Sequence, residues 1–268
     1  MEIRIFDVAH GFCAYVIADN GNVMLIDCGH NDQTGFRPSN YLTTNGCTGI
    51  ERLIISNYDE DHLSDLPNIR QRLPIQILRR NKSITADELR SLKLRAGPIQ
   101  PGMVTLLDMI ITYTSDVVNP PEFPGIELAT FSNSYPTFQD TNNLSLVTFL
   151  HYRNIHIIFP GDLEKAGWQE LLNQQSFVEH LRRVSLFVAS HHGRESGYYA
   201  EIFDYCHPEL VIISDESIQY ETQETEYQRH AGGIRWGDGH RYVLTTRNDG
   251  MITIRQREGE NPQVSTGG

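Results

Sequence analysis

The sequence contains no apolar run that could cross a lipid bilayer. A membrane-spanning helix needs about 18 consecutive apolar residues, and no segment of the 268-residue chain approaches that length. The N-terminal MEIRIFDVAH places charged residues within its apolar alternation, which indicates a strand rather than a signal peptide. We therefore expect a cytoplasmic protein with no membrane partner.

Cysteine is scarce. The chain has four cysteines, at Cys13, Cys28, Cys47 and Cys206, and no two of them form a CxxC pair. Their spacing therefore indicates neither a disulfide framework nor a zinc ribbon. Cys13 and Cys28 lie in apolar, strand-like stretches, so we expect buried free thiols there.

Basic residues are also few: 22 Lys and Arg stand against 34 Asp and Glu, which gives a net charge of −12. Proteins that clamp long duplex DNA usually carry a basic stripe, and none is obvious in this sequence. The densest basic stretch is interrupted by Asp87 and Glu88, and it fits either a solvated helical segment or a local contact for phosphate groups. Its members are Arg70, Arg72, Arg79, Arg80, Lys82, Arg90, Lys93 and Arg95.

Short apolar stretches that end in turn residues predict the strands. Asn248-Asp249-Gly250 is a strong turn signal, so we expect a final hairpin between 241–246 and 251–255. The other predicted strands are 3–8, 12–18, 23–27, 52–56, 127–131, 145–151, 155–159, 184–189 and 210–214.

Helices are expected at 63–73 and 163–182, where apolar residues recur at helical spacing. The region 74–125 reads as an insertion with a short strand, a polar helix and another apolar strand, and a proline-rich loop covers 113–127. The tail from Glu258 to Gly268 is expected to be disordered.

Strands come first and strand–helix alternation follows in each half of the chain. Strand VMLID, which ends at Asp27, and strand IHIIFPGD, which ends at Asp162, look like counterparts. This weak internal symmetry predicts an α/β fold with two packed sheets and helices outside. We expect it to form one domain over residues 1–257.

Three predicted strands end directly in side chains that can bind metals. The strand ends of a layered α/β protein converge on one edge, and converging carboxylates repel one another unless a cation lies between them. Taken singly, Asp61-His62 and Asp162 also fit helix N-termini, and His191-His192 fits a turn before Gly193. Their joint occurrence in this order favours a metal site. The three segments are Asn57/Asp59/Asp61/His62, then Asp162, then His191/His192.

These segments resemble the motifs of the metallo-β-lactamase superfamily. SNYDEDHLSDL is similar to the HxHxDH motif, with Asn57 and Asp59 at the two first histidine positions, and FPGD and SHHG match the later motifs. The order of DVAHG, LIDCG, NNLSLV, GD, HHG and a late DG is most like the soluble nuclease-like domain of bacterial ComEC DNA-uptake proteins. The resemblance implies an αββα sandwich of two mixed sheets with helices outside.

The resemblance also implies two divalent metal ions, Zn²⁺ or Mn²⁺. The first ion would take Asn57, Asp59, Asp162 and Asn143, and the second would take Asp61, His62, Asp162 and His191. Asn57 departs from the family's histidine and is a poor zinc ligand, so the oxygen-rich first site favours Mn²⁺ or Mg²⁺ and is expected to be weak.

The function that follows is hydrolysis of a nucleic acid or nucleotide phosphodiester, in which protein partner subunits could take part. Asp61 would position or deprotonate the attacking water, and His192 would donate to the phosphate or to the leaving oxygen. His192 also fits a purely structural hydrogen bond. His230 could face the site, or it could belong to a polar helix surface, and His10 could lie at the metal edge.

Two other functions stay open at this point. One is a binding or regulatory module with a degraded metal site, which Asn57 and the acidic composition favour. The other is a hydrolase of a different ester class, although relatives of that kind keep the histidine pair that is absent here.

Overall fold

Two mixed β-sheets pack face to face in the computed structural model, which describes residues 1–115, 117–216 and 222–267. The first sheet has the order β15-β14-β1-β2-β3-β4-β5. Its strands are β1 (Glu2–Ile5), β2 (Ala14–Ile17), β3 (Val23–Ile26), β4 (Ile50–Ile54), β5 (Ile75–Arg79), β14 (Ile252–Arg255) and β15 (Gln263–Thr266).

The second sheet has the order β13-β10-β9-β8-β7-β6. Its strands are β6 (Ile126–Ser132), β7 (Leu146–Tyr152), β8 (Ile155–Phe159), β9 (Leu186–Val188), β10 (Leu210–Ile213) and β13 (Val243–Thr245). A separate small hairpin joins β11 (Ile234–Trp236) to β12 (Gly239–Arg241).

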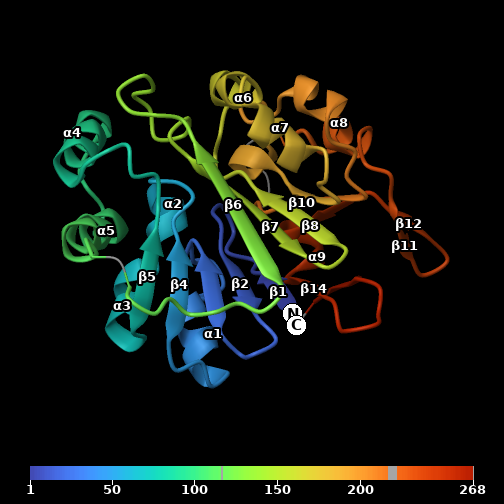
Figure 1. Ribbon diagram of the computed structural model, residues 1–268, viewed down its shortest axis with the longest axis horizontal. Helices are drawn as coiled ribbons and strands as arrows, with labels where there is room; N and C mark the ends of the chain where they lie inside the picture. Colours follow the sequence, from blue (N-terminus) through green and yellow to red (C-terminus); the bar gives the residue numbers. More distant parts are fainter. Residues whose placement is uncertain (116, 217–221, 268) are drawn as a thin grey trace.

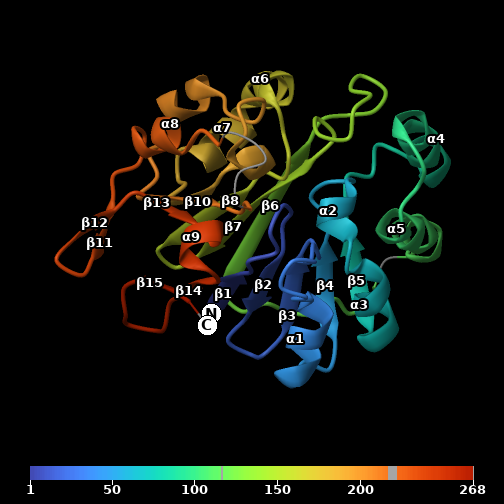
Figure 2. The same cartoon turned by 180° about the vertical axis from the view of Figure 1, so that it is seen from behind.

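Helices cover the outer face of each sheet (Figures 1 and 2). The first sheet carries α1 (Pro38–Thr44), α2 (Glu60–Leu63), α3 (Leu66–Arg72), α4 (Ala86–Ala96) and α5 (Pro101–Thr112). The second sheet carries α6 (Lys165–Leu172), α7 (Gln175–Leu181), α8 (Glu224–Gln228) and the 3-10 turns η1 (Ser190–Gly193) and η2 (Ala200–Asp204). The short α9 (Thr246–Asp249) connects the two sheets.

Three apolar layers hold this αββα sandwich together. Strand β3 is buried along its whole length because its side chains alternate between two layers. Val23 and Leu25 face the helices of the first sheet, while Met24 and Ile26 pack against the second sheet. Trp168 and other large side chains fill the third layer, under the helices of the second sheet. The predicted fold class is confirmed.

The topology brings several strand ends to one edge. Strands β3, β4 and β5 run parallel in the first sheet, as do β8, β9, β10 and β13 in the second. The segments that follow β4, β8 and β9 therefore leave the sandwich at neighbouring points, which is where α/β sheets place their functional groups.

The C-terminal part of the sequence prediction was wrong. The expected final hairpin does not form, because β13 pairs with β10 in the second sheet and β14 pairs with β1 in the first. Asn248-Asp249-Gly250 ends α9, where Gly250 takes a φ of 69°. The tail expected to be disordered instead returns as β15, antiparallel to β14.

The segment 74–125, expected to be an insertion, forms part of the first sheet and of its apolar layer. It supplies β5, the edge strand of the first sheet, and α5, whose Met103, Leu106 and Leu107 are buried in the first apolar layer. The apolar stretch in α5 was expected to be a strand, but it forms a helix because its apolar residues recur with helical spacing. The predicted helix 163–182 is divided into α6 and α7. Within the described residues, no helix has the length and apolarity that crossing a membrane requires.

Candidate metal centre

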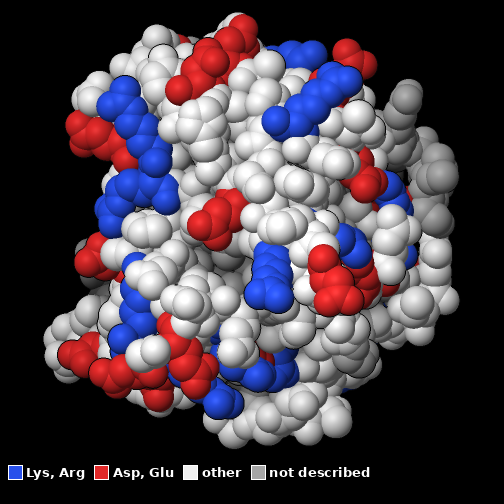
Figure 3. Space-filling model, turned by 90° about the vertical axis from the view of Figure 1, so that its right-hand side faces the viewer, with Lys and Arg blue, Asp and Glu red and all other residues white. Residues whose placement is uncertain are grey.

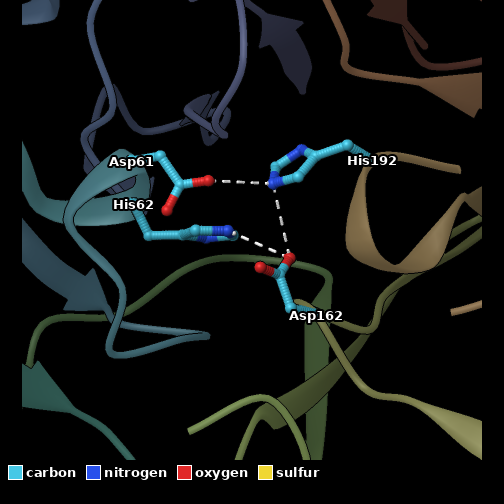
Figure 4. Close-up of side chains that lie close together, drawn as sticks. All are labelled: Asp61, His62, Asp162 and His192. Carbon is cyan, nitrogen blue, oxygen red and sulfur yellow. Dashed lines mark ion pairs between the residues drawn. The ribbon is translucent and has the colours of Figure 1, made fainter. Parts of the chain in front are cut away.

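Four side chains from three segments meet at the shared edge of the sandwich (Figure 4). Asp61 and His62 lie on α2, directly after β4, whereas Asp162 follows β8 and His192 follows β9. One potential ligand atom from each residue lies within 4.8 Å of all the others. His62 Nε2 is 3.0 Å from Asp162 Oδ1, and His192 Nε2 is 3.2 Å from Asp61 Oδ2.

Three of these ligand atoms are buried, and among the described residues their only polar partners are other members of the cluster. They are His62 Nε2, Asp162 Oδ1 and His192 Nε2. Buried imidazoles and carboxylates that face only one another need an explanation, and a bound ion between them is one. Two imidazole nitrogens and two carboxylates form a donor set that suits Zn²⁺ or Mn²⁺. The residues present therefore fit a divalent ion.

The second ring nitrogen of each histidine is fixed by an anchor. His62 Nδ1 donates to Asp27 Oδ2 at 2.8 Å, and His192 Nδ1 donates to the carbonyl oxygen of Ser214 at 3.0 Å. Asp27 is itself held by the backbone N–H of Ser56 at 2.7 Å and by the Ser56 hydroxyl. Such anchors fix the ring orientation, so that Nε2 faces the cluster and can offer its lone pair to an ion once its proton has left.

The charges of the cluster are balanced internally. Burial raises the pKa of Asp61, but the charge of His62 and the hydrogen bond and charge of His192 outweigh it and lower that pKa to about 2. Burial lowers the pKa of His62, yet the charges of Asp162, Asp27 and Asp61 raise it well above 6.5. Burial also lowers the pKa of His192, but the charges of Asp162 and Asp61 outweigh burial, and the pKa is raised. Protons on these histidines therefore supply the positive charge that a bound ion would otherwise supply.

The backbone around the cluster is strained. Asp27, His191 and His192 have φ values of 57°, 50° and 55°, in the left-handed region that side chains with a Cβ rarely adopt. Such strain gathers at functional sites, where the surrounding structure fixes it.

Two glycines allow α2 to approach the strands closely. A Cβ on Gly29 would lie 2.2 Å from the carbonyl oxygen of Asp61, and one on Gly11 would lie 2.4 Å from the same atom. Only glycine fits in these two positions, which explains why both the DVAHG and LIDCG segments end in it.

The sequence model of the metallo-β-lactamase superfamily matches residues 13–176. The chain belongs to the metallo-β-lactamase superfamily. It is similar to ComE operon protein 3 of Bacillus subtilis (strain 168), with 22% identity over 174 residues, which cover 65% of this chain and 21% of that protein. The chain thus spans about a fifth of this curated relative's length.

Solved structures share the architecture at low identity. A mutant of CmlA β-hydroxylase matches with a TM-score of 0.54 and 11% identity, over 95% of this chain and 54% of that chain. A diphosphatase from the PhnP family matches with a TM-score of 0.47 and 10% identity, over 94% and 97% of the two chains. The match to CmlA shows a shared fold.

In this superfamily protein, the structure brings Asp61, His62 and Asp162 together as the sequence predicts, but it exchanges the two adjacent histidines. His192, expected to donate to the phosphate, lies in the cluster, whereas His191, expected to be a ligand, lies outside it. His191 Nδ1 is 2.9 Å from Ser196 Oγ and 3.3 Å from a Glu164 carboxylate oxygen. The left-handed backbone at both histidines decides which ring faces inward, and the sequence carries no signal for it.

Three more predicted ligands have other partners. Asn57 is fully buried, and its Nδ2 donates to Ser145 Oγ at 3.1 Å. Asp59 Oδ1 accepts from Lys93 Nζ at 2.6 Å. Asn143 Oδ1 accepts the backbone N–H groups of Glu164 and Gly167 at 3.2 and 2.9 Å, so this side chain caps the start of α6.

His230 is not one of the four cluster residues. Its ring stacks on Phe203 with centroids 4.1 Å apart, and its Nε2 is 2.9 Å from the Tyr198 hydroxyl. His230 comes two residues after the end of α8, and its catalytic role stays a prediction.

Two residues complete the rim of the centre. His10 lies beside the cluster, with Nε2 3.5 Å from Asp61 Oδ2, which is the position expected for it. Arg194 donates to His10 Nε2 at 2.6 Å and to His191 Nε2 at 3.2 Å. Sequence reasoning missed Arg194 and the anchoring role of Asp27. The sequence offered a signal for each: Asp27 ends the strand in LIDCG, and Arg194 closes the SHHGR segment that follows a strand.

Proposed function

We propose that this protein is a divalent-metal-dependent hydrolase of phosphodiesters, with nucleic acid or a nucleotide as its substrate. The observation that carries the proposal is the cluster of Asp61, His62, Asp162 and His192, in which four potential ligand atoms face one another within 4.8 Å. A bound divalent ion would lower the pKa of a water molecule and neutralise charge on a phosphate oxygen.

Three residues of the centre are buried, and the fourth, Asp61, is partly exposed. The side chains of His62, Asp162 and His192 are at most 3% exposed, whereas that of Asp61 is 22% exposed. Asp61 is therefore the carboxylate that solvent can reach, and it is suited to orient a water molecule and accept its proton. Asp27 and Ser214 hold the two histidine rings in place.

Arg194 favours an anionic substrate. Its guanidinium lies at the rim and bridges His10 and His191, so a permanent positive charge stands beside the cluster. Guanidinium groups bind phosphate oxygens with charge-assisted hydrogen bonds. This feature and the motifs shared with nuclease-like domains support a phosphodiester over an uncharged ester.

Recognition is expected to be local. The net charge is −12, and on the face shown in Figure 3 acidic and basic side chains are interspersed rather than gathered into a stripe of one sign. A surface of this kind does not support a long electrostatic grip on duplex DNA. Phosphate contacts close to the centre would then determine binding.

Removal of the central carboxylate tests the proposal. Asp162→Asn keeps the side-chain volume but loses the charge, so bound Mn²⁺ or Zn²⁺ and turnover of bis-p-nitrophenyl phosphate should both fall by a factor of about 100 or more. Metal content is measured by mass spectrometry after dialysis, and Asp87→Asn, at an exposed position on α4, is the control.

Each contrary result has a separate meaning. Wild-type turnover of a carboxylic ester without turnover of the diester would indicate another ester class. Folded wild-type protein that takes up no metal and turns over neither substrate would indicate a binding module. Full activity in Asp162→Asn would show that the centre lies elsewhere.

A further inference from the structure

A lysine is paired with Asp59, one of the residues that the motif comparison assigned to the first metal ion. Asp59, at the second ligand position of the motif, forms an ion pair in which Lys93 Nζ is 2.6 Å from its Oδ1. The Thr141 hydroxyl donates to the same oxygen at 2.8 Å. The carboxylate is thus paired with a cation supplied by the chain itself.

Hydrogen bonds connect this ion pair to the metal centre. The backbone N–H of Asp59 donates to Asn57 Oδ1 at 2.7 Å, and Asn57 Nδ2 donates to Ser145 Oγ at 3.1 Å. Ser145 Oγ also accepts the backbone N–H of Asp162 at 3.1 Å. Asp59 is in addition the residue that precedes α2, the helix that carries Asp61 and His62. Lys93 is therefore linked to the centre through Asp59, Asn57 and Ser145.

The remaining donors on this side do not fit an ion. Asn143 Oδ1 uses both of its lone pairs on backbone N–H groups of the α6 segment. Asn57 turns its amide nitrogen toward the oxygens of Ser145, Thr141 and Asn142, and its own oxygen accepts from Asp59. Asp59 alone among these three carries a charge, and Lys93 already neutralises it.

We propose that the centre holds one divalent ion and that Lys93 replaces the second, with its ammonium binding a phosphate oxygen of the substrate. The substrate part rests on the proposed function. An ammonium has three N–H donors and Asp59 takes one, so others remain for an anion. The Lys93 side chain is 20% exposed, which leaves it within reach of a ligand.

Helix α4 explains how the lysine comes to lie there. The helix begins with a capping box between Thr85 and Glu88, and Lys93 lies in its last turn, where a positive charge is favourable. Figure 1 shows α4 at the same end of the molecule as α2. One residue of the basic segment would thus contact phosphate, while exposed members such as Arg90 remain in solvent.

The test compares Lys93→Met with Arg90→Met, which removes one positive charge from an exposed position on the same helix. Wild-type protein dialysed against Mn²⁺ should hold one ion per chain by mass spectrometry. Inorganic phosphate should bind the Mn²⁺-loaded Lys93→Met variant about tenfold more weakly than wild type, as expected for loss of one charged contact. Calorimetry measures that affinity, and Arg90→Met should match wild type.

Two results would overturn the inference: two ions per wild-type chain, or an unchanged phosphate affinity in Lys93→Met. Failure of the proposed function looks different. Wild type would then hold one ion and bind phosphate through Lys93, yet turn over no phosphodiester. With an active wild type, Lys93→Met should raise KM for bis-p-nitrophenyl phosphate about tenfold while its metal content stays the same.

Discussion

His62 and His192 each present one ring nitrogen to the centre and hold a proton there when no ion is bound. The charge of Asp162 contributes to a raised pKa for both, against the effect of burial. Each histidine thus loses its proton only as the pH rises through a pKa above the ordinary value of 6.5. An incoming ion must displace these protons.

Metal affinity should therefore increase with pH. Between about pH 6 and pH 8, Mn²⁺ should bind more tightly at each higher pH and release protons on binding. Calorimetry in buffers of different ionisation enthalpy counts those protons. Affinity that does not change over this range, with no proton release, would show that the two imidazoles are not ligands.

Asn57 is best explained by its own hydrogen bonds. Because it is fully buried between Ser145 and the backbone of Asp59, Asn57→His should reduce the free energy of unfolding by about 1–3 kcal/mol. The ratio of Zn²⁺ to Mn²⁺ affinity should stay unchanged, as in the exposed control Asn119→His. A folded Asn57→His variant that shifts this ratio toward Zn²⁺ would place position 57 among the ligands.

At the residue scale, the sequence predicted the type of site better than its members. Asp61, His62 and Asp162 could be found because each lies in the polar segment that follows a buried strand. The choice between His191 and His192 depends on backbone dihedral angles, and no residue type at these positions reveals them. The partners of Asn57, Asp59 and Asn143 come from segments distant in sequence, so spacing could not predict them.

The elements around the centre depend on close backbone contacts. Helix α2 reaches its position because Gly29, after β3, leaves room for the carbonyl oxygen of Asp61. Gly29→Ala would force these groups apart, which should lower stability by about 1–3 kcal/mol and weaken Mn²⁺ binding. Urea unfolding and calorimetry measure the two effects.

Gly239→Ala is the matched control. An added Cβ at Gly239 meets only the carbonyl oxygen of Trp236, at 4.0 Å. If both variants lose stability and metal binding equally, the contact between Gly29 and Asp61 does not position α2.

Strands were the most predictable elements. Strand β3 is buried on both faces, so all its residues are apolar, and the sequence shows that run directly. Helix α5 was missed because a short apolar stretch fits a buried strand as well as a buried helix. The final hairpin was wrong because a turn signal between two apolar stretches does not tell whether they pair with each other or, as β13 and β14 do, with different sheets.

At the scale of the whole molecule, the order of the motifs was enough to predict two sheets with helices outside. This layering determines where the strand ends meet, and the metal centre lies there. Strand β15 and the ion pair between Lys93 on α4 and Asp59 depend on long-range pairing, which local sequence patterns do not encode.

The central claim is that Asp61, His62, Asp162 and His192 bind a divalent ion. A crystal grown with Mn²⁺, measured at wavelengths on both sides of the manganese absorption edge, tests it most directly. The account predicts one anomalous peak within about 2.0–2.3 Å of all four side chains. A folded protein with no peak among these residues, or with its main peak at Asp59, would contradict it.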